Sequence, residues 1–311
     1  MTFLKQRQTL RLTVTVELVG QRLDQYLALA SDLLSRGSAR KLIDIGAVHL
    51  NGRRVRKCSL VVNNGDRIEI HIDGLPLTPY SLVTDDIIYE DKYLLVVQKP
   101  AGVDSQPTPS RYKGTLYAAL SEYLKNPLRK DLRPTIGMVQ RLDRDTSGLI
   151  VFSIHQAAHK ELTRSFQERD VTKKYQAFVA GRLLEEKGEF RSLLAKRRAT
   201  NTMKSVARGG QEAITRFHLL AATDEVSYVE IEIPTGRSHQ IRAHFSEAGH
   251  PLLGDVRYGG PNRIGDVTFE RQMLHARQLS LKHPKSGEPL DFLSELPYDM
   301  QRVKTDFFNG H

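Results

Sequence analysis

The chain has 311 residues, of which 40% are hydrophobic and 26% charged, and 46 Lys and Arg against 36 Asp and Glu give a formal net charge of +10. This length suits about two domains with a sizeable core, and the composition excludes a disordered or collagen-like chain. The single cysteine, Cys58, excludes an intrachain disulfide framework and any metal or iron–sulfur site built from several cysteines, and is typical of a reducing compartment.

Charge and hydropathy indicate where the chain acts. The N-terminal stretch MTFLKQRQTLRLTV is interrupted by charges, so it is not the apolar core of a signal peptide. No apolar run approaches the roughly 20 residues that span a bilayer. We therefore expect a cytoplasmic protein without membrane contact. The positive charge favours nucleic acid as the partner, and a merely basic enzyme stays open as the alternative.

Two short helices open the first predicted domain, residues 17–74. Helical spacing predicts the first one after Arg22, with four apolar residues on one face: Leu23, Leu27, Ala30 and Leu34. The second is predicted to start near Ser38 and to end at Gly46.

A hairpin and a closing strand complete this domain. Asn51-Gly52 is the strongest two-residue hairpin signal, and it follows the apolar residues Val48 and Leu50. Residues 68–72 alternate isoleucine with Glu69 and His71, as in a half-buried strand. The stretch Gly74 to Ser81, with two prolines, is predicted to be a linker.

Basic residues gather around the second helix and the hairpin. The candidates for RNA binding are Arg36, Arg40, Lys41, Arg53, Arg54 and Arg56. Such a cluster can bind phosphates, and each contact releases counterions, so binding would weaken steeply with salt. The alternative is a solvated charged face, because Asp24, Asp32 and Asp44 leave the domain only mildly basic.

The pattern from about Gly20 to Ile72 resembles the S-four-like RNA-binding module, an αL-type RNA-binding domain. The resemblance rests on RLDQYL, on SARKLIDIGAVHLNGRRV and on the closing GDRIEI. It implies that the N-terminal domain contacts RNA.

Strands and helices are mixed in the second predicted domain, residues 83–297. Apolar patterns predict strands at 87–89, 93–98, 149–154, 174–179 and 228–233. A helix follows residue 154, with Ala158, Leu162 and Phe166 on one face. The connections are uneven and no regular strand–helix alternation appears, which favours an α+β domain with a mixed sheet over a doubly wound parallel fold.

Charged residues are concentrated in the segment IGMVQRLDRDTSGLIVFSI, residues 136–154. Asp143 and Asp145 alternate with Arg141 and Arg144, and residues 146–148 are predicted to form a turn. Charges at the mouth of a buried strand are costly unless they are paired or used. From the residues alone, a structural ion-pair network and a functional site both stay open.

The string VQRLDRDTSGL resembles the central motif of the RluA-like pseudouridine synthases. Further motifs follow in the family's order: VTKKY at 171–175, IPTGRSHQIRAH at 233–244, GDVRYGG at 254–260 and LHARQLSLKHP at 274–284. The resemblance implies the pseudouridine synthase fold, an α+β domain with a mixed, mainly antiparallel sheet. It also implies isomerisation of uridine within RNA: uracil is detached from ribose, rotated and rejoined through ring carbon five.

The resemblance also implies the role of each site residue. Asp143 matches the catalytic carboxylate. Arg141 matches the residue that fills the vacated gap or guides the flipped nucleotide, and Arg242 the arginine that pairs with the carboxylate. Tyr175 matches the aromatic residue that packs on the target ring; from the pattern alone it is a core residue, because Ala177 and Val179 share its face. The reaction requires no cofactor or metal, and its covalent or glycal course stays open.

Some residues depart from the family pattern, and others leave more than one role open. The family's usual His before Arg-Leu-Asp is Gln140 here, which cannot carry charge, and the stretch 104–107 departs from the usual His-Pro ending. Arg242 is expected near the start of a helix over 238–248. His239 and His244 lack a third ligand nearby, so helix packing or RNA contact is favoured over a metal site.

Competing functions stay open. The expected substrate is large-subunit ribosomal RNA, with transfer RNA second, and no obligate protein partner is implied. The rivals are a non-catalytic RNA-binding assembly factor and a glycoside hydrolase that uses Asp143 and Asp145 as its carboxylate pair.

Overall fold

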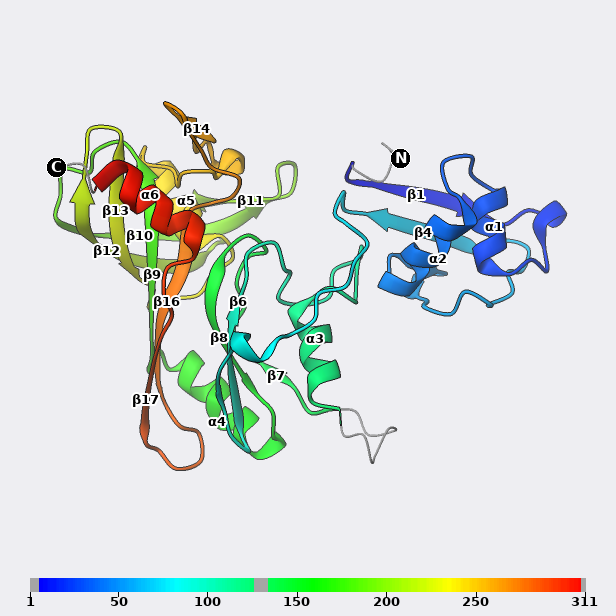
Figure 1. Ribbon diagram of the computed structural model, residues 1–311, viewed down its shortest axis with the longest axis horizontal. Helices are drawn as coiled ribbons and strands as arrows, with labels where there is room; N and C mark the ends of the chain where they lie inside the picture. Colours follow the sequence, from blue (N-terminus) through cyan, green and yellow to red (C-terminus); the bar gives the residue numbers. More distant parts are fainter. Residues whose placement is uncertain (1–5, 126–133, 309–311) are drawn as a thin grey trace. The chain divides into compact units, whose positions relative to one another are not determined.

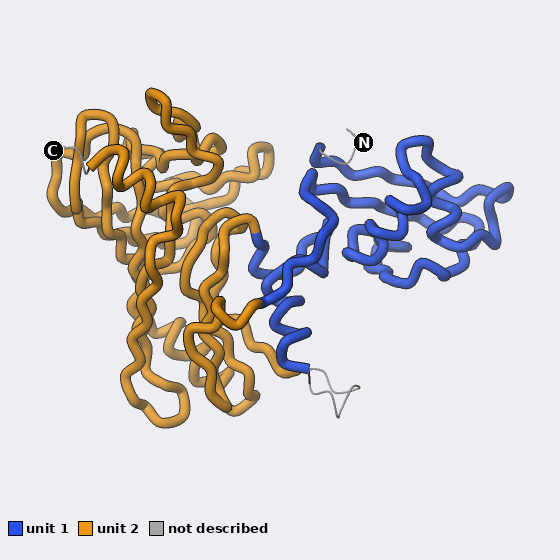
Figure 2. Tube along the Cα trace, in the orientation of Figure 1, with its two compact units in different colours: residues 1–82, 103–133 blue, residues 83–102, 134–311 orange. Residues whose placement is uncertain are grey.

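The computed structural model describes residues 6–125 and 134–308 (Figure 1). Two compact units divide the chain: residues 1–82 with 103–133, and residues 83–102 with 134–311 (Figure 2). Residues 103–125, which the sequence analysis placed with the second domain, therefore group with the N-terminal unit. Within the described ranges, no helix is long and apolar enough to cross a membrane.

The first unit combines a small antiparallel sheet, in the strand order β1-β4-β2-β3, with three described α-helices and one short 3₁₀ helix. Its strands are β1 (Gln8–Thr13), β2 (Val48–Leu50), β3 (Arg53–Arg54) and β4 (Arg67–Ile72). Its helices are η2 (Val16–Leu18), α1 (Leu23–Leu29), α2 (Arg36–Ile45) and α3 (Leu116–Tyr123). Strand β1 was not predicted: its alternating pattern rests on only two apolar residues, Leu10 and Leu12, and both stay partly exposed.

Local signals set the ends of these elements. The side chain of Ser35 accepts a hydrogen bond from the Ser38 amide and caps α2, which therefore begins two residues earlier than predicted, at Arg36. It ends at Gly46 in the left-handed conformation, as predicted. The hairpin is confirmed: Asn51 and Gly52 have φ angles of 51° and 77°, which a type I′ turn requires. Helix α1 is shorter than predicted, and Leu34 reaches the core from a loop.

An 11-stranded sheet forms the second unit, in the order β11-β10-β12-β13-β9-β16-β8-β6-β5, with β17 beside β16 and β7 beside β8. Its first strands are β5 (Ile87–Glu90), β6 (Leu94–Lys99), β7 (Gly137–Met138), β8 (Ser147–Ser153), β9 (Val171–Ala180) and β10 (Lys187–Arg197). The others are β11 (Thr202–Val206), β12 (Gln211–Ala222), β13 (Val226–Glu232), β16 (Leu274–Lys282) and β17 (Pro289–Leu293). All described pairings in this sheet are antiparallel except β16 with β8, which confirms the predicted α+β class.

Helices and a small ribbon complete the second unit. They are η3 (Thr84–Asp86), α4 (Gln156–Gln167), α5 (Gln240–Glu247), η4 (Val256–Tyr258), α6 (Tyr298–Phe308) and the ribbon β14 (Arg263–Ile264) with β15 (Val267–Thr268). Helix α4 packs its apolar residues, Leu162 among them, against β6, β8 and β16. Helix α6 packs Met300 and Val303 against Phe178 and Tyr228. This second contact buries both faces of β9 at Phe178, where the sequence predicted a half-buried strand.

The parallel pairing of β16 with β8 joins two antiparallel halves of the sheet (Figure 1). At this point the predicted turn over residues 146–148 is wrong: the turn lies at Arg144–Asp145, and Ser147 already begins β8. Gly148 has a φ angle of 115°, and a Cβ atom there would lie 2.3 Å from the Ala276 carbonyl oxygen. The strands thus approach too closely for any other residue.

His275 lies at the same junction and makes the stability of this unit depend on pH. It is fully buried between Ser147 and Ser294, whose Oγ atoms lie 2.9 and 3.1 Å from its ring nitrogens, and burial lowers its pKa to about 4. The unfolded chain binds a proton on this histidine near its ordinary pKa of about 6.5. Stability from the neutral ring is therefore complete above about pH 6.5 and is lost as the pH falls toward 4.

We expect this residue alone to remove about 3 kcal/mol of unfolding free energy between pH 7 and pH 4. Urea unfolding at pH 7, 5.5 and 4.5 measures the loss in the wild type and in His275→Gln. The Gln variant is less stable at pH 7 but has a shallower pH dependence. Equal losses in both proteins would show that His275 does not titrate on unfolding.

Candidate active site

The loop between β7 and β8 carries Asp143. It is a tight loop, because the Thr146 amide donates a hydrogen bond of 3.1 Å to the Asp143 carbonyl. The Asp143 side chain is 22% exposed, so its carboxylate can reach a ligand. Its surroundings come from α5, from η4 and from β9, elements that follow it in the sequence.

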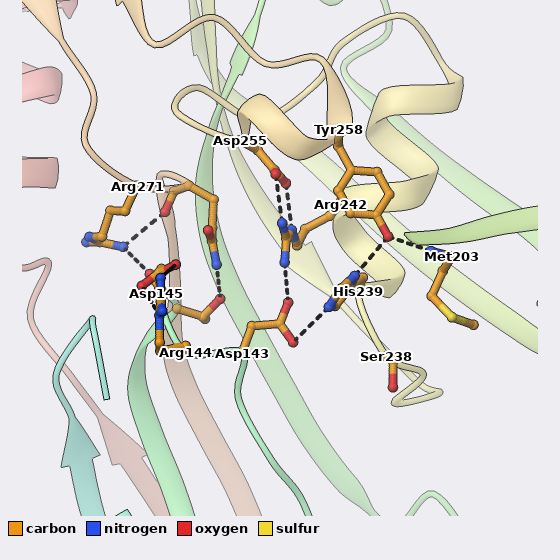
Figure 3. A network of polar contacts seen from close by, with 12 residues as sticks. Asp143, Arg144, Asp145, Met203, Ser238, His239, Arg242, Asp255, Tyr258 and Arg271 are labelled. Carbon is orange, nitrogen blue, oxygen red and sulfur yellow. Dashed lines mark hydrogen bonds and ion pairs between the residues drawn. The ribbon is translucent and has the colours of Figure 1, made fainter. Parts of the chain in front are cut away.

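Arg242, on α5, joins two carboxylates (Figure 3). Its Nη1 donates to Asp143 Oδ2 at 2.9 Å, while its Nε and Nη2 donate to the two oxygens of Asp255 at 2.6 and 2.8 Å. Burial opposes the charge of this guanidinium, but Asp255 and then Asp143 outweigh burial and hold its pKa above the ordinary value. The permanent cation therefore fixes the direction of the Asp143 carboxylate.

His239 faces the second oxygen of this carboxylate, with its Nε2 at 3.9 Å from Asp143 Oδ1. Its Nδ1 lies 2.9 Å from the hydroxyl of Tyr258, and that hydroxyl already accepts the amide hydrogen of Met203 at 2.7 Å. The hydroxyl proton is thus free to point at Nδ1, which assigns the remaining ring hydrogen to Nε2. Burial lowers the pKa of His239, so a neutral ring presents an N–H group toward Asp143.

Tyr175, on β9, is both a core residue and a neighbour of the site. Its side chain is almost fully buried, as the pattern of the strand predicted. Burial and then the nearby charge of Asp143 raise the pKa of its phenol, so the group stays protonated. The structure thus shows Tyr175 as a core residue, and its position near Asp143 leaves its packing on a target base as a prediction.

Several groups hold the backbone of the Asp143 loop. The buried ammonium of Lys99 donates to the carbonyls of Pro100 and Arg144 at 2.8 and 2.9 Å, and the Gly102 amide donates to the same Arg144 carbonyl. Arg271 donates from Nη1 to the Asp145 carbonyl at 3.1 Å. These contacts fix the loop before any ligand arrives, as a catalytic group requires.

The neighbouring carboxylate, Asp145, has a different cation. Arg144 donates to it from Nε and Nη2 at 3.0 and 3.2 Å, and Figure 3 shows this pair on the other side of the loop from Arg242. Asp143 and Asp145 are thus not held as a matched pair, as the glycoside hydrolase alternative would need.

The other predicted residues near the loop have distinct surroundings. Arg141 is exposed and donates a hydrogen bond to the Ser238 hydroxyl. The side-chain amide nitrogen of Gln140 is buried and has no hydrogen-bond partner among the described residues. His244 places its two ring nitrogens 3.0 and 2.9 Å from the hydroxyls of Ser192 and Thr215, which gives it a packing role within the sheet.

The RNA-binding candidates of the first unit fall into two groups. Three are engaged: Arg36 with the carboxylate of Asp24, Arg54 with the carbonyls of residues 108 and 109, and Arg56 over the ring of Tyr112 at 4.4 Å. Arg40, Lys41 and Arg53 are exposed, and their side chains have no hydrogen bond or ion pair within residues 6–125. The predicted cluster therefore offers three uncommitted cations rather than six.

Comparison with known proteins gives two family matches. Residues 93–247 match the model of the RNA pseudouridylate synthases, and residues 21–68 match the S4 domain. An uncharacterized RNA pseudouridine synthase of Aquifex aeolicus is 35% identical over 298 residues, which cover 93% of this chain and 94% of that protein. A ribosomal large subunit pseudouridine synthase D of Zymomonas mobilis is 36% identical and covers 94% of this chain and 96% of that protein.

The chain belongs to the RluA-like RNA pseudouridine synthases. Solved structures agree in fold. The human RNA pseudouridylate synthase domain containing 4 has a TM-score of 0.59 at 24% identity, over 71% of this synthase and 92% of that chain. The enzyme is thus an isomerase with an N-terminal S4 domain, as the sequence predicted.

Sequence reasoning missed several residues of this synthase's site. Asp255 and Tyr258 lie within the GDVRYGG motif, where a carboxylate and a phenol between glycines were the available signal. His239 was considered only as a metal ligand, for packing or for RNA contact. Lys99 was not considered either, because its contact with the Asp143 loop is to the carbonyl of Arg144, 45 residues away in the sequence.

Proposed function

We propose that this synthase converts uridine to pseudouridine in large-subunit ribosomal RNA, with Asp143 as its catalytic carboxylate. The observation that carries the proposal is the ion pair between Asp143 and Arg242, which aims a partly exposed carboxylate beside Tyr175 and His239. A fixed anion of this kind can act as a nucleophile or a base.

The atoms and protons of the reaction balance without a cofactor or a second substrate. The bond between ribose C1′ and uracil N1 breaks, a bond between C1′ and C5 forms, and the proton that leaves C5 is matched by one gained at N1. The uridine must leave the base stack to reach Asp143. Arg141, exposed and next to Ser238, is proposed to occupy the gap or guide the extruded nucleotide, since its planar guanidinium can stack and donate.

Tyr175 is proposed to pack on the extruded uracil. The charge of Asp143 reaches its phenol, so the ring lies close enough to the carboxylate to contact a base that is bound there. Stacking of this kind contributes on the order of 1–3 kcal/mol per base.

Large-subunit ribosomal RNA is the proposed substrate because relatives from Zymomonas mobilis and Vibrio parahaemolyticus, 36% and 33% identical, are named ribosomal large subunit pseudouridine synthase D. The S4 domain and its uncommitted cations support RNA binding outside the catalytic unit. We propose residues 17–74 as the RNA-binding domain and residues 83–297 as the catalytic domain, apart from the segment 103–125 that groups with the N-terminal unit. The cytoplasm is the proposed place of action.

Release of tritium tests the proposal. We expect the purified synthase to release tritium from large-subunit ribosomal RNA transcripts made with uridine labelled at C5, and to release far less from transfer RNA transcripts. Release only from transfer RNA would contradict the proposed substrate. Binding of both RNAs without any release would favour the assembly-factor alternative and contradict the proposed reaction.

A further inference from the structure

Lys173, on β9, has a mostly buried side chain whose ammonium has no acceptor among the described residues. Its side chain is only 8% exposed, and among residues 6–125 and 134–308 it has no hydrogen bond or ion pair. Its closest described ring contact is weak, with Nζ 5.6 Å from the centre of the Phe166 ring. Its Nζ is not among the fully enclosed polar atoms without a partner, so the end of the side chain can still be reached from solvent. An ammonium that is mostly removed from water and has no acceptor in the protein is a favourable place for an anion that comes from elsewhere.

The surroundings of Lys173 are positive. Burial, followed by the charges of Arg169 and Arg237, lowers its pKa to about 8. The carboxylate that pairs with Arg169, Glu212, also faces a third arginine: its Oε2 lies 3.0 Å from Arg169 and its Oε1 lies 3.4 Å from Arg191. The cluster of Lys173, Arg169 and Arg237 thus contains more positive charge than its neighbours balance.

Gly236 leaves room beside this ammonium. A Cβ atom at Gly236 would lie 3.8 Å from Lys173 Nζ, so the glycine keeps the backbone of the 234–239 loop close without a side chain over the nitrogen. Arg237 is the next residue. Its Nε donates to the Glu212 carbonyl at 2.9 Å, and this hydrogen bond holds the guanidinium in place. A small anion can therefore approach between the lysine and this loop.

The cluster lies next to the catalytic site in the same unit. Lys173 and Tyr175 are two residues apart on β9, so they share one face of the strand and lie about 7 Å apart along it. The Ile233 amide donates to the Lys173 carbonyl at 3.2 Å, and the loop that begins there leads to His239, which faces Asp143. An anion at Lys173 would thus be about one nucleotide away from a base at Tyr175.

We infer that Lys173 and Arg237 bind a backbone phosphate of the RNA beside the uridine that enters the Asp143 site. This inference rests on the proposed function, since it takes the RNA as the ligand. The lysine supplies a compact charge to one phosphate oxygen, and the guanidinium of Arg237 can donate to another. The phosphate supplies the acceptor that the protein itself does not give to the buried ammonium.

Salt dependence of binding tests the inference without any need for turnover. We expect Lys173→Met to lower the slope of log affinity against log salt by about 0.7–0.9, the value of one lost phosphate contact, in filter binding to a large-subunit RNA fragment. The ratio of wild-type affinity to variant affinity then falls about threefold as the salt concentration rises from 50 to 200 mM. Lys187→Met, at an exposed lysine on β10, is the matched control and keeps the wild-type slope.

Folding separates this role from a structural one. Lys173→Met replaces an unpaired buried cation by an apolar chain of similar length, so we expect its melting temperature to equal or exceed that of the wild type. Lys173→Arg keeps the positive charge, so we expect it to keep most of the slope of log affinity against log salt. A folded Lys173→Met variant whose salt-dependence slope equals that of the wild type would overturn the inference. If Lys173→Met does not fold, a wild-type slope in Arg237→Gln would overturn it instead. Failure of tritium release with an altered slope would instead contradict only the proposed reaction.

Discussion

Asp143→Asn lowers the rate of tritium release from C5-labelled ribosomal RNA by at least about 10³-fold and leaves RNA affinity nearly unchanged. Asparagine has the same shape as aspartate and can still accept a hydrogen bond from Arg242 Nη1, so the fold and the binding surface persist. What it lacks is the anionic oxygen that attacks carbon or removes a proton. Single-turnover release with enzyme in excess measures the chemical step apart from binding.

Asp145→Asn is the matched control for this substitution. Asp145 is two residues away and also carries a carboxylate, but its side chain contacts Arg144 rather than Arg242. Loss of this partly exposed ion pair costs at most about 1 kcal/mol, so we expect turnover within about tenfold of the wild type. Turnover by Asp143→Asn at the wild-type rate would refute the assigned role. Equal losses in both variants would point to a shared carboxylate mechanism.

Arg242→Met is expected to have the second largest effect, on both stability and rate. It leaves Asp255, which is 2% exposed, without its bidentate cation, and breaking such a buried pair costs about 3–5 kcal/mol. It also frees Asp143 from its fixed direction, so tritium release falls by at least about 10²-fold. Urea unfolding and single-turnover release measure the two effects in the same protein.

The double variant Arg242→Met with Asp255→Asn separates these effects. It removes the uncompensated charge of Asp255, so most of the lost unfolding free energy returns, while the direction of Asp143 is not restored. We therefore expect a stable protein that still releases tritium slowly. Recovery of the full rate along with stability would show that Arg242 serves only the fold.

The sequence predicted the elements whose signals are local. The Asn51-Gly52 hairpin and the end of α2 at Gly46 depend on residues that adopt positive φ angles, and these were placed correctly. The start of α2 at Arg36 was missed because its first turn carries no apolar residue. Gly148 was interpreted as part of a turn, whereas its conformation is imposed by Ala276, a residue of a distant strand.

The site could be predicted only as far as its motifs reach. Asp143 and Arg242 were paired through the family resemblance, and the structure brings them to 2.9 Å. The roles of Lys99 and Arg271 in holding backbone carbonyls leave no sequence pattern, because any residue type can present a carbonyl. The same reason explains why Arg54 was assigned to RNA, although it contacts the carbonyls of residues 108 and 109.

The single parallel pairing in the large sheet has a consequence for the catalytic geometry. Asp143 enters from the β8 side of that junction, whereas Arg242 and Tyr175 belong to the side built on β9 and β13. Among the described residues, the parallel ladder across it consists of two residue pairs, His275 with Ser147 and Ala276 with Gly148. The position of Asp143 relative to Arg242 and Tyr175 therefore depends in part on this short parallel ladder, and a shift of β8 against β16 would move the carboxylate relative to the groups that orient it.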